Sequence, residues 1–167
     1  MGGTLTVDSA QGRGSTFTVI IPESPGDAAA FAPRAEETRP AYPPGVRVLV
    51  VYDNDINLTV AAGLLVEIFG IACDLAHSGP EALEMVTRRD YALVFMDQMM
   101  PEMDGVETAR RIRAMGGKYA DLTIVALTAN AVKGTREQLL AAGISDYLTK
   151  PIEVSEMDAI LRRWIPR

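Results

Sequence analysis

The chain has 167 residues, of which 48% are hydrophobic and 23% charged, and its formal net charge is −6. This size and composition are typical of a soluble globular protein with one domain, or with one domain and an appendage. The acidic balance argues against nucleic-acid partners, and no apolar run reaches the ~20 residues that membrane insertion needs. The single cysteine, Cys73, excludes an internal disulfide and favours a reducing, cytoplasmic compartment, although a longer parent protein could still be membrane-anchored.

The first 22 residues are predicted to form a β-hairpin. Residues 4–7 and 15–21 alternate between polar and apolar side chains, and the stretch between them is rich in turn-forming residues. An isolated hairpin is at best marginally stable in water, so we expect this one to belong to a larger sheet. Residues 23–45 are rich in proline, alanine and charge, and they are predicted to be a linker.

Residues 46–167 are predicted to form an α/β domain, because short apolar strands alternate with helices. The predicted strands are 46–51, 71–76, 91–96, 122–127 and 146–148. The predicted helices are about 56–69, 79–89, 105–115, 131–142 and 153–165. Five such pairs indicate a doubly wound parallel sheet, whose ligand site lies at the carboxyl ends of the strands.

Several local patterns support these helices. Gly70 and Gly143 fall where helices end and suit left-handed C-caps. The arginines 110, 111 and 113 are predicted to lie on a solvated helix face. The first helix is expected to bury one apolar stripe, made of Ala61, Leu64, Leu65 and Ile68.

Polar side chains follow several strands at the predicted ligand edge. Asp97 follows the third strand, and the Met-Pro break beyond it is expected to aim its carboxylate into solvent. Asp53 follows the first strand, which neighbours the third in such a sheet. Two close carboxylates repel each other and need a divalent cation or a proton between them. The chain lacks a Cys/His set for zinc, so Mg²⁺ is the expected cation.

Two further strand ends add groups that suit a phosphoryl ligand. Thr128 supplies a hydroxyl donor after the fourth strand, and Lys150 supplies a positive charge after the fifth. Together with Asp53 and Asp97 they describe a carboxylate that accepts a phosphoryl group.

At these residues the sequence resembles the receiver domain of response regulators, of the kind fused to hybrid histidine kinases. The matching stretches are 51–57, 96–105, 126–131 and 146–151. The resemblance implies a flavodoxin-like (βα)5 fold with strand order 2-1-3-4-5.

The resemblance also implies a role for each matching residue. Asp97 would be the phosphoacceptor and a metal ligand, with Asp53 and the Met99 backbone carbonyl as the other protein ligands to Mg²⁺. Lys150 would bind the phosphoryl group, and a cis bond would precede Pro151. Thr128 would be the switch hydroxyl, whose movement is followed by the rotamer of one aromatic residue, Tyr147.

The function implied is that of a phosphoacceptor in a two-component phosphorelay. The donor would be a phosphohistidine on a histidine kinase or a histidine phosphotransfer protein. Phosphorylation would switch the face formed by the fourth helix, fifth strand and fifth helix. That face, or the hairpin, is a candidate surface for a homodimer. Beyond its own phosphorylation and dephosphorylation at Asp97, this chain is not expected to be an enzyme.

The N-terminal residues carry a second resemblance. Residues 1–9 and 12–17 are similar to the last hairpin of a histidine-kinase ATP-binding domain. The motifs that hold ATP in that family lie upstream and are absent here, so we expect this chain neither to bind ATP nor to phosphorylate itself. The chain would then be a piece of a hybrid kinase or a truncated gene product.

One position departs from the receiver pattern. The family usually has two adjacent acidic residues after the first strand, and here the first of them is Tyr52. We expect weakened but not abolished Mg²⁺ affinity, and a phosphate pocket partly covered by the phenol; alternatively, Tyr52 turns outward. Asp55 either compensates in part or serves the start of the first helix.

Two other functions compete with phosphate acceptance. Because of Tyr52, the chain could be a degenerate receiver that docks partners independently of phosphorylation. The Asp-x-Asp pattern at Asp53 and Asp55 also imitates haloacid-dehalogenase-like phosphatases. That family needs a further acidic pair beyond its lysine, whereas a single predicted helix follows Lys150, so the phosphatase interpretation is disfavoured.

Overall fold

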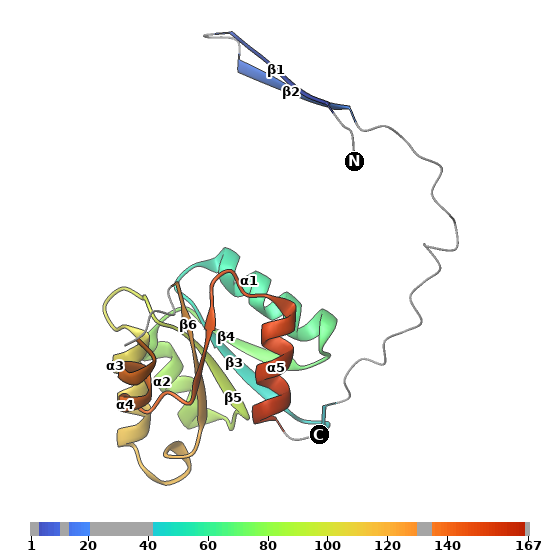
Figure 1. Ribbon diagram of the computed structural model, residues 1–167. Coiled ribbons are helices and arrows are strands. Elements are labelled where there is room, and N and C mark those ends of the chain that lie inside the picture. Colours follow the sequence, from blue (N-terminus) through green and yellow to red (C-terminus); the bar gives the residue numbers. More distant parts are fainter. Residues whose placement is uncertain (1–3, 11–13, 21–41, 130–134, 166–167) are drawn as a thin grey trace. The chain divides into compact units, whose positions relative to one another are not determined.

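The computed structural model describes residues 4–10, 14–20, 42–129 and 135–165. The chain divides into two units, an N-terminal hairpin and an α/β domain, and each is described by itself (Figure 1). Most of the predicted linker, residues 11–13 of the predicted hairpin turn and residues 131–134 of the fourth predicted helix lie outside the described residues.

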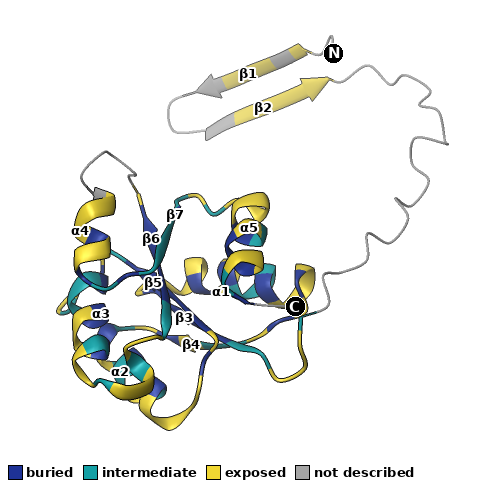
Figure 2. Cartoon of the chain, turned by 60° about the horizontal axis from the view of Figure 1, so that its bottom comes forward, coloured by how far each residue is buried: buried dark blue, intermediate teal, exposed yellow. Residues whose placement is uncertain are grey.

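The hairpin pairs β1 (Thr4–Ala10) with β2 (Gly14–Ile20) in antiparallel register. Val7 lies opposite Phe17, and Val19 follows two residues later, so all three side chains share one face. They are 55%, 67% and 62% exposed, and Figure 2 shows the strands coloured accordingly. The predicted hairpin is confirmed, and its assignment to a larger kinase sheet stays a prediction.

The α/β domain is built on a five-stranded parallel sheet. Its strand order is β4-β3-β5-β6-β7, which is 2-1-3-4-5 within the domain. The strands are β3 (Arg47–Val51), β4 (Ala72–Ala76), β5 (Leu93–Asp97), β6 (Thr123–Thr128) and β7 (Asp146–Thr149). The predicted flavodoxin-like fold is confirmed.

Helices cover both faces of this sheet (Figures 1 and 2). They are α1 (Asp55–Gly63), the π-helix η2 (Leu64–Ile68), α2 (Gly79–Arg88), α3 (Gly105–Ala114), the 3₁₀ turn η3 (Gly117–Tyr119), α4 (Thr135–Ala141) and α5 (Val154–Trp164). Helices α1, η2 and α5 bury Leu58, Leu65 and Met157 against one face. Helices α2, α3 and α4 bury Ala82, Ile112 and Leu139 against the other.

Caps fix the loops that leave the strand ends. Asn54 caps α1, because its side-chain oxygen accepts hydrogen bonds from the backbone N–H groups of Ile56 and Asn57. Asp55 therefore lies in the first turn, where its charge favours the helix dipole, rather than at the cap. Gly70 and Gly143 adopt positive φ angles of 65° and 83°, as predicted for left-handed helix ends.

Candidate functional site

Asp97 is the last residue of β5, and its carboxylate is held inside the domain. Its side chain is 3% exposed, so the expectation that the carboxylate points into solvent is wrong. Oxygen Oδ1 accepts a hydrogen bond from Lys150 Nζ at 2.7 Å and another from the Met99 backbone N–H at 3.1 Å. These two donors take the place of water at the buried Oδ1 oxygen.

The ends of β6 and β7 bring Thr128 and Lys150 to the same edge of the sheet. Asp97 lies opposite Leu127 in the parallel register, so Thr128 is one residue beyond it, and Thr128 is 2% exposed. The Lys150 backbone N–H donates to the Thr128 carbonyl oxygen at 2.8 Å. The peptide bond between Lys150 and Pro151 is cis, as the resemblance implied.

Backbone hydrogen bonds hold both ends of the loop that follows Asp97. The Gln98 N–H donates to the Leu127 carbonyl oxygen at 3.0 Å, and the Gly105 N–H donates to the Gln98 carbonyl oxygen at 3.1 Å. Gly105 then opens α3 behind its cap, Asp104. Gly105 was not among the predicted site residues. Its signal in the sequence is a glycine directly after a helix cap, which permits a close backbone approach.

Asp53 stands beside Asp97 in the register of the sheet. Val51 of β3 pairs with Met96 of β5, and each carboxylate follows within two residues of that pair. Asp53 is exposed. Across the described residues, no three or more His, Cys, Asp or Glu side chains gather as a metal-binding group. Asp55 therefore gives no third carboxylate here, and its side chain instead lies 3.1 Å from His77 Nδ1.

This ligand set can be tested against the cation that the sequence implies. Mg²⁺ in proteins is usually bound by one or two carboxylates, and retained waters and phosphate oxygens complete the octahedron. Asp53 and Asp97 supply two carboxylates at neighbouring strand ends, and the Met99 backbone carbonyl as a third ligand stays a prediction. These residues therefore fit a Mg²⁺ site in which the protein supplies few of the ligands and water supplies the others.

Tyr52 lies against the core rather than outside it. The residue is 2% exposed and belongs to the apolar cluster that contains Val50, Leu58 and Phe95. Its ring centroid is 4.6 Å from Lys150 Nζ. Burial, and then the charges of Asp97 and Asp53, hold the pKa of the Tyr52 phenol above its usual range. The side chain is therefore neutral, and the interpretation that it turns outward is wrong.

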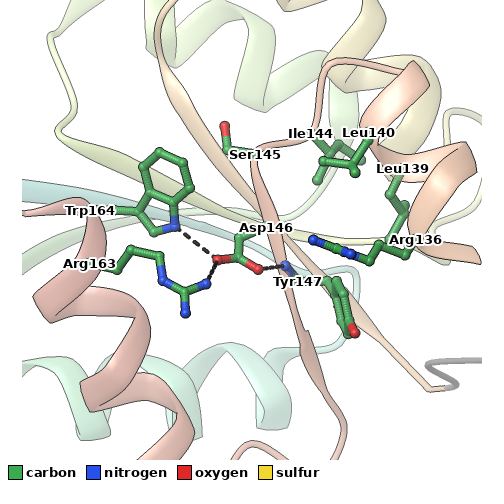
Figure 3. A pocket seen from close by; sticks show the side chains of 9 residues that line it. All are labelled: Arg136, Leu139, Leu140, Ile144, Ser145, Asp146, Tyr147, Arg163 and Trp164. Atoms are coloured by element: carbon green, nitrogen blue, oxygen red, sulfur yellow. Dashed lines mark hydrogen bonds and ion pairs between the residues drawn. The ribbon is translucent and has the colours of Figure 1, made fainter.

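A hollow of about 210 Å³ lies beside Tyr147. Figure 3 shows the residues that line it: Arg136, Leu139, Leu140, Ile144, Ser145, Asp146, Tyr147, Arg163 and Trp164. Asp146 Oδ2 accepts hydrogen bonds from Arg163 Nη1 at 2.7 Å and from Trp164 Nε1 at 3.0 Å. These bonds fasten the start of β7, next to Tyr147, to the end of α5.

Within the described part of the chain, no helix is both long enough and apolar enough to cross a membrane. A cytoplasmic location for this chain stays a prediction.

Comparisons with known proteins agree with this geometry. Residues 48–162 match the response regulator receiver domain family. The aerobic respiration control sensor protein ArcB of Escherichia coli is 36% identical over 171 residues, which cover 98% of this chain and 21% of ArcB. This chain thus spans about a fifth of the length of that relative, and the alignment extends upstream of the receiver region.

Solved structures show the same similarity. One is the receiver domain of sensor histidine kinase PA1611 from Pseudomonas aeruginosa PAO1, with a magnesium ion coordinated in its active site cleft. It is 39% identical with a TM-score of 0.67, over 74% of this chain and 99% of that chain. Another is the Saccharomyces cerevisiae co-crystal of the histidine phosphotransfer protein Ypd1 with the receiver domain of Ssk1. It is 30% identical with a TM-score of 0.67, over 75% of this chain and 91% of that chain. The chain therefore belongs to the response regulator receiver domain family.

Proposed function

We propose that Asp97 accepts a phosphoryl group from a phosphohistidine, and that Lys150 and Thr128 assist the transfer. The observation that carries the proposal is the 2.7 Å contact between Lys150 Nζ and Asp97 Oδ1 at the carboxyl edge of the sheet. A buried carboxylate held by a lysine, beside a second carboxylate and a threonine, suits the negative oxygens of a transferring phosphoryl group.

In this reaction an oxygen of Asp97 forms a bond to phosphorus while the phosphorus–nitrogen bond of the phosphohistidine breaks. The electron pair of that bond stays on the imidazole nitrogen, which takes up a proton from solution. Asp97 becomes an acyl phosphate, and the Lys150 ammonium pairs with the phosphoryl oxygens.

We propose Asp53, Asp97 and the Met99 carbonyl as the protein ligands to Mg²⁺. When bound, the cation would supply positive charge against the phosphoryl oxygens. The magnesium ion in the active site cleft of the PA1611 receiver structure supports Mg²⁺ as the cation. Because the neutral Tyr52 stands where the family usually has a carboxylate, we propose that Mg²⁺ binds more weakly here.

The alternative of a degenerate receiver that only docks partners is not supported. It depended on Tyr52 disrupting the site, yet the Tyr52 ring packs in the core and the pairing of Lys150 with Asp97 is formed. The match to the receiver family over residues 48–162 agrees with an intact acceptor domain.

A histidine kinase or a histidine phosphotransfer protein is the proposed donor, supported by the Ypd1–Ssk1 receiver complex. We propose that the face formed by α4, β7 and α5, with Tyr147, transmits the phosphorylated state. A homodimer through this face or through the β1–β2 hairpin stays a prediction. The alignment with ArcB upstream of the receiver supports the assignment of residues 1–22 to the end of a kinase ATP-binding domain, and of residues 23–45 to a linker.

Acetyl phosphate with Mg²⁺ tests the acceptor role. Intact-mass analysis should show one added phosphoryl group, and borohydride reduction of the acyl phosphate should mark residue 97 as homoserine. Asp97→Asn should abolish the adduct, whereas Asp121→Asn, which removes a carboxylate from the loop before β6, should retain it. Phosphorylation of Asp97→Asn to the wild-type level, or a label at another residue, would refute the proposal.

A further inference from the structure

We propose that Tyr52 is a positioning residue for phosphoryl transfer, whose ring face holds the Lys150 ammonium beside Asp97. The inference rests on the proposed function, because it assigns Tyr52 a task within the same site. In place of a carboxylate, the chain would use an aromatic ring to orient its phosphate-binding lysine.

The first support is geometric. Lys150 Nζ lies 4.6 Å from the Tyr52 ring centroid and 2.7 Å from Asp97 Oδ1. An ammonium group within about 6 Å of an aromatic ring centroid is attracted by the ring quadrupole, more strongly when water is excluded. Lys150 has a side chain that is 26% exposed and Tyr52 is 2% exposed, so water is largely excluded from one side of this contact.

The second support is that backbone and core contacts hold Tyr52 in place. Its backbone N–H donates to the Ala76 carbonyl oxygen at 3.0 Å, and its ring packs with Val50 and Leu58 in the core beneath α1. A flexible lysine side chain loses conformational entropy when it is ordered. If the Tyr52 ring already holds the ammonium in place, less of this entropy is lost during phosphoryl transfer.

The third support comes from charge. A carboxylate at position 52 would attract the same ammonium and compete with Asp97 for it. The aromatic ring attracts the ammonium without offering a hydrogen-bond acceptor of comparable strength, so Lys150 stays paired with Asp97 Oδ1. The ring at position 52 thereby leaves Lys150 paired with Asp97, but the site has one carboxylate fewer for Mg²⁺.

Nuclear magnetic resonance tests the contact directly. The chain has three lysines, Lys118, Lys133 and Lys150, so selective lysine labelling gives few ε-methylene signals, and Lys150→Arg identifies the one from Lys150. The Tyr52 ring current should move this signal upfield in wild type. Tyr52→Phe should retain the shift, and Tyr52→Leu should remove it. Lys118 is a built-in control, because it lies 5.2 Å from the Tyr119 ring and should not respond.

The transfer rate gives the functional test. With acetyl phosphate at saturating Mg²⁺, which removes effects on metal affinity, Tyr52→Leu should be phosphorylated about five-fold more slowly. Tyr52→Phe should restore most of the rate, because it keeps the ring face. The matched control is Tyr91→Leu, which removes another buried tyrosine, 9% exposed, on the amino-terminal side of β5, away from Asp97. It should lower stability without changing the Lys150 signal or the rate.

The outcomes separate this inference from the proposed function. If wild-type Asp97 takes no phosphoryl group, the proposed function fails, whatever the Lys150 signal shows. If Asp97 is phosphorylated but the Lys150 signal is unshifted in wild type, or Tyr52→Leu retains both shift and rate, the role of Tyr52 is overturned and the acceptor role stands. Should Tyr52→Leu not fold, Tyr52→Met and the wild-type signal decide the matter.

Discussion

Gly105 packs against the backbone of Asp97 so closely that a β-carbon on Gly105 would lie 2.2 Å from the Asp97 carbonyl oxygen. Real carbon–oxygen contacts are far longer, so any larger residue at 105 must displace the loop that follows the acceptor.

Gly105→Ala should therefore destabilise the domain by about 1–3 kcal/mol and slow phosphorylation of Asp97. The free energy from urea unfolding and the rate with acetyl phosphate measure the two effects. Gly63→Ala is the matched control, because a β-carbon there meets no atom within 4 Å and its backbone is helical. That change should leave the rate unaltered and stabilise by about 0.5–1 kcal/mol. If the two variants have the same stability and the same phosphorylation rate, the close contact between Gly105 and Asp97 does not have the expected effect.

Removing the charge of Lys150 should leave Asp97 without its main partner. We expect Lys150→Met to slow phosphoryl acceptance by about a hundred-fold at saturating Mg²⁺, the usual effect of losing one preorganised donor. Single-turnover kinetics measure the loss. A rate within a factor of three of wild type would show that the 2.7 Å contact has no part in transfer.

Tyr52→Asp should tighten Mg²⁺ binding by at least about ten-fold. A unit charge ~4–5 Å from a divalent cation contributes a few kcal/mol at an effective dielectric near 20, and screening at an open site reduces this. Titration calorimetry measures the dissociation constant. Tyr52→Asn is the control, because it removes the phenol without adding charge. If the aspartate variant binds Mg²⁺ no more tightly than wild type, the proposal of weakened affinity is wrong.

The environment of Asp74, which lies on β4 outside the candidate site, should make the stability of the domain depend on pH. Burial alone would raise its pKa, but a hydrogen bond from Tyr91 and the charges of Arg47 and Arg89 outweigh burial and lower it below 3.8. The ionised form is favoured in the folded state, so this stabilisation is present above the unfolded-state pKa and lost as pH falls through the lower folded-state value.

Asp74→Asn should accordingly be less stable than wild type at pH 7, and the difference should shrink as the pH is lowered below about 4. Urea unfolding across this range measures it. Burial and then the hydrogen bond to Asp74 raise the pKa of Tyr91 to about 12, so the variant should also titrate Tyr91 at lower pH in ultraviolet absorbance. A stability difference that stays constant down to pH 3 would rule out this linkage.

Arg113 contradicts the prediction that the arginines of α3 all face solvent. Its guanidinium donates to the carbonyl oxygens of Gly143 at 2.8 Å and of Tyr119 at 2.7 Å, which ties α3 to the end of α4. Arg113→Ala should cost about 1–3 kcal/mol, because these carbonyls lose charged donors. Arg111→Ala should cost about 0.5 kcal/mol or less, since Arg111 forms an exposed pair with Glu107. Thermal unfolding of both variants compares them.

The fold and the strand-end residues could be predicted because buried parallel strands are apolar throughout and end in polar residues. Asp97, Thr128 and Lys150 followed from that pattern, and their convergence follows from the parallel register. The burial of the Asp97 side chain could not be predicted, because it depends on a contact with Lys150, which lies 53 residues further along the chain. The same limit applied to Arg113, whose partners come from two other segments.

The first helix shows a second limit. Ala61 and Leu65 are buried as the helical stripe predicted, but Ile68 is 38% exposed and Phe69 is buried in its place. The helix changes to π geometry at Leu64–Ile68, where the i→i+5 bonds place more residues in each turn and rotate the later side chains. A stripe at the α-helical period cannot anticipate that shift.

The link between Asp146 and Trp164 gives the domain its own optical probe. Trp164 is the single tryptophan of the chain. Its indole nitrogen and the Arg163 guanidinium both donate hydrogen bonds to one oxygen of Asp146, which directly precedes Tyr147. Indole fluorescence responds to the electric field of a nearby carboxylate. A movement of β7 relative to α5 should therefore change the emission wavelength or the intensity of Trp164 fluorescence. The wild-type protein can thus report movement on the proposed signalling face without an attached dye.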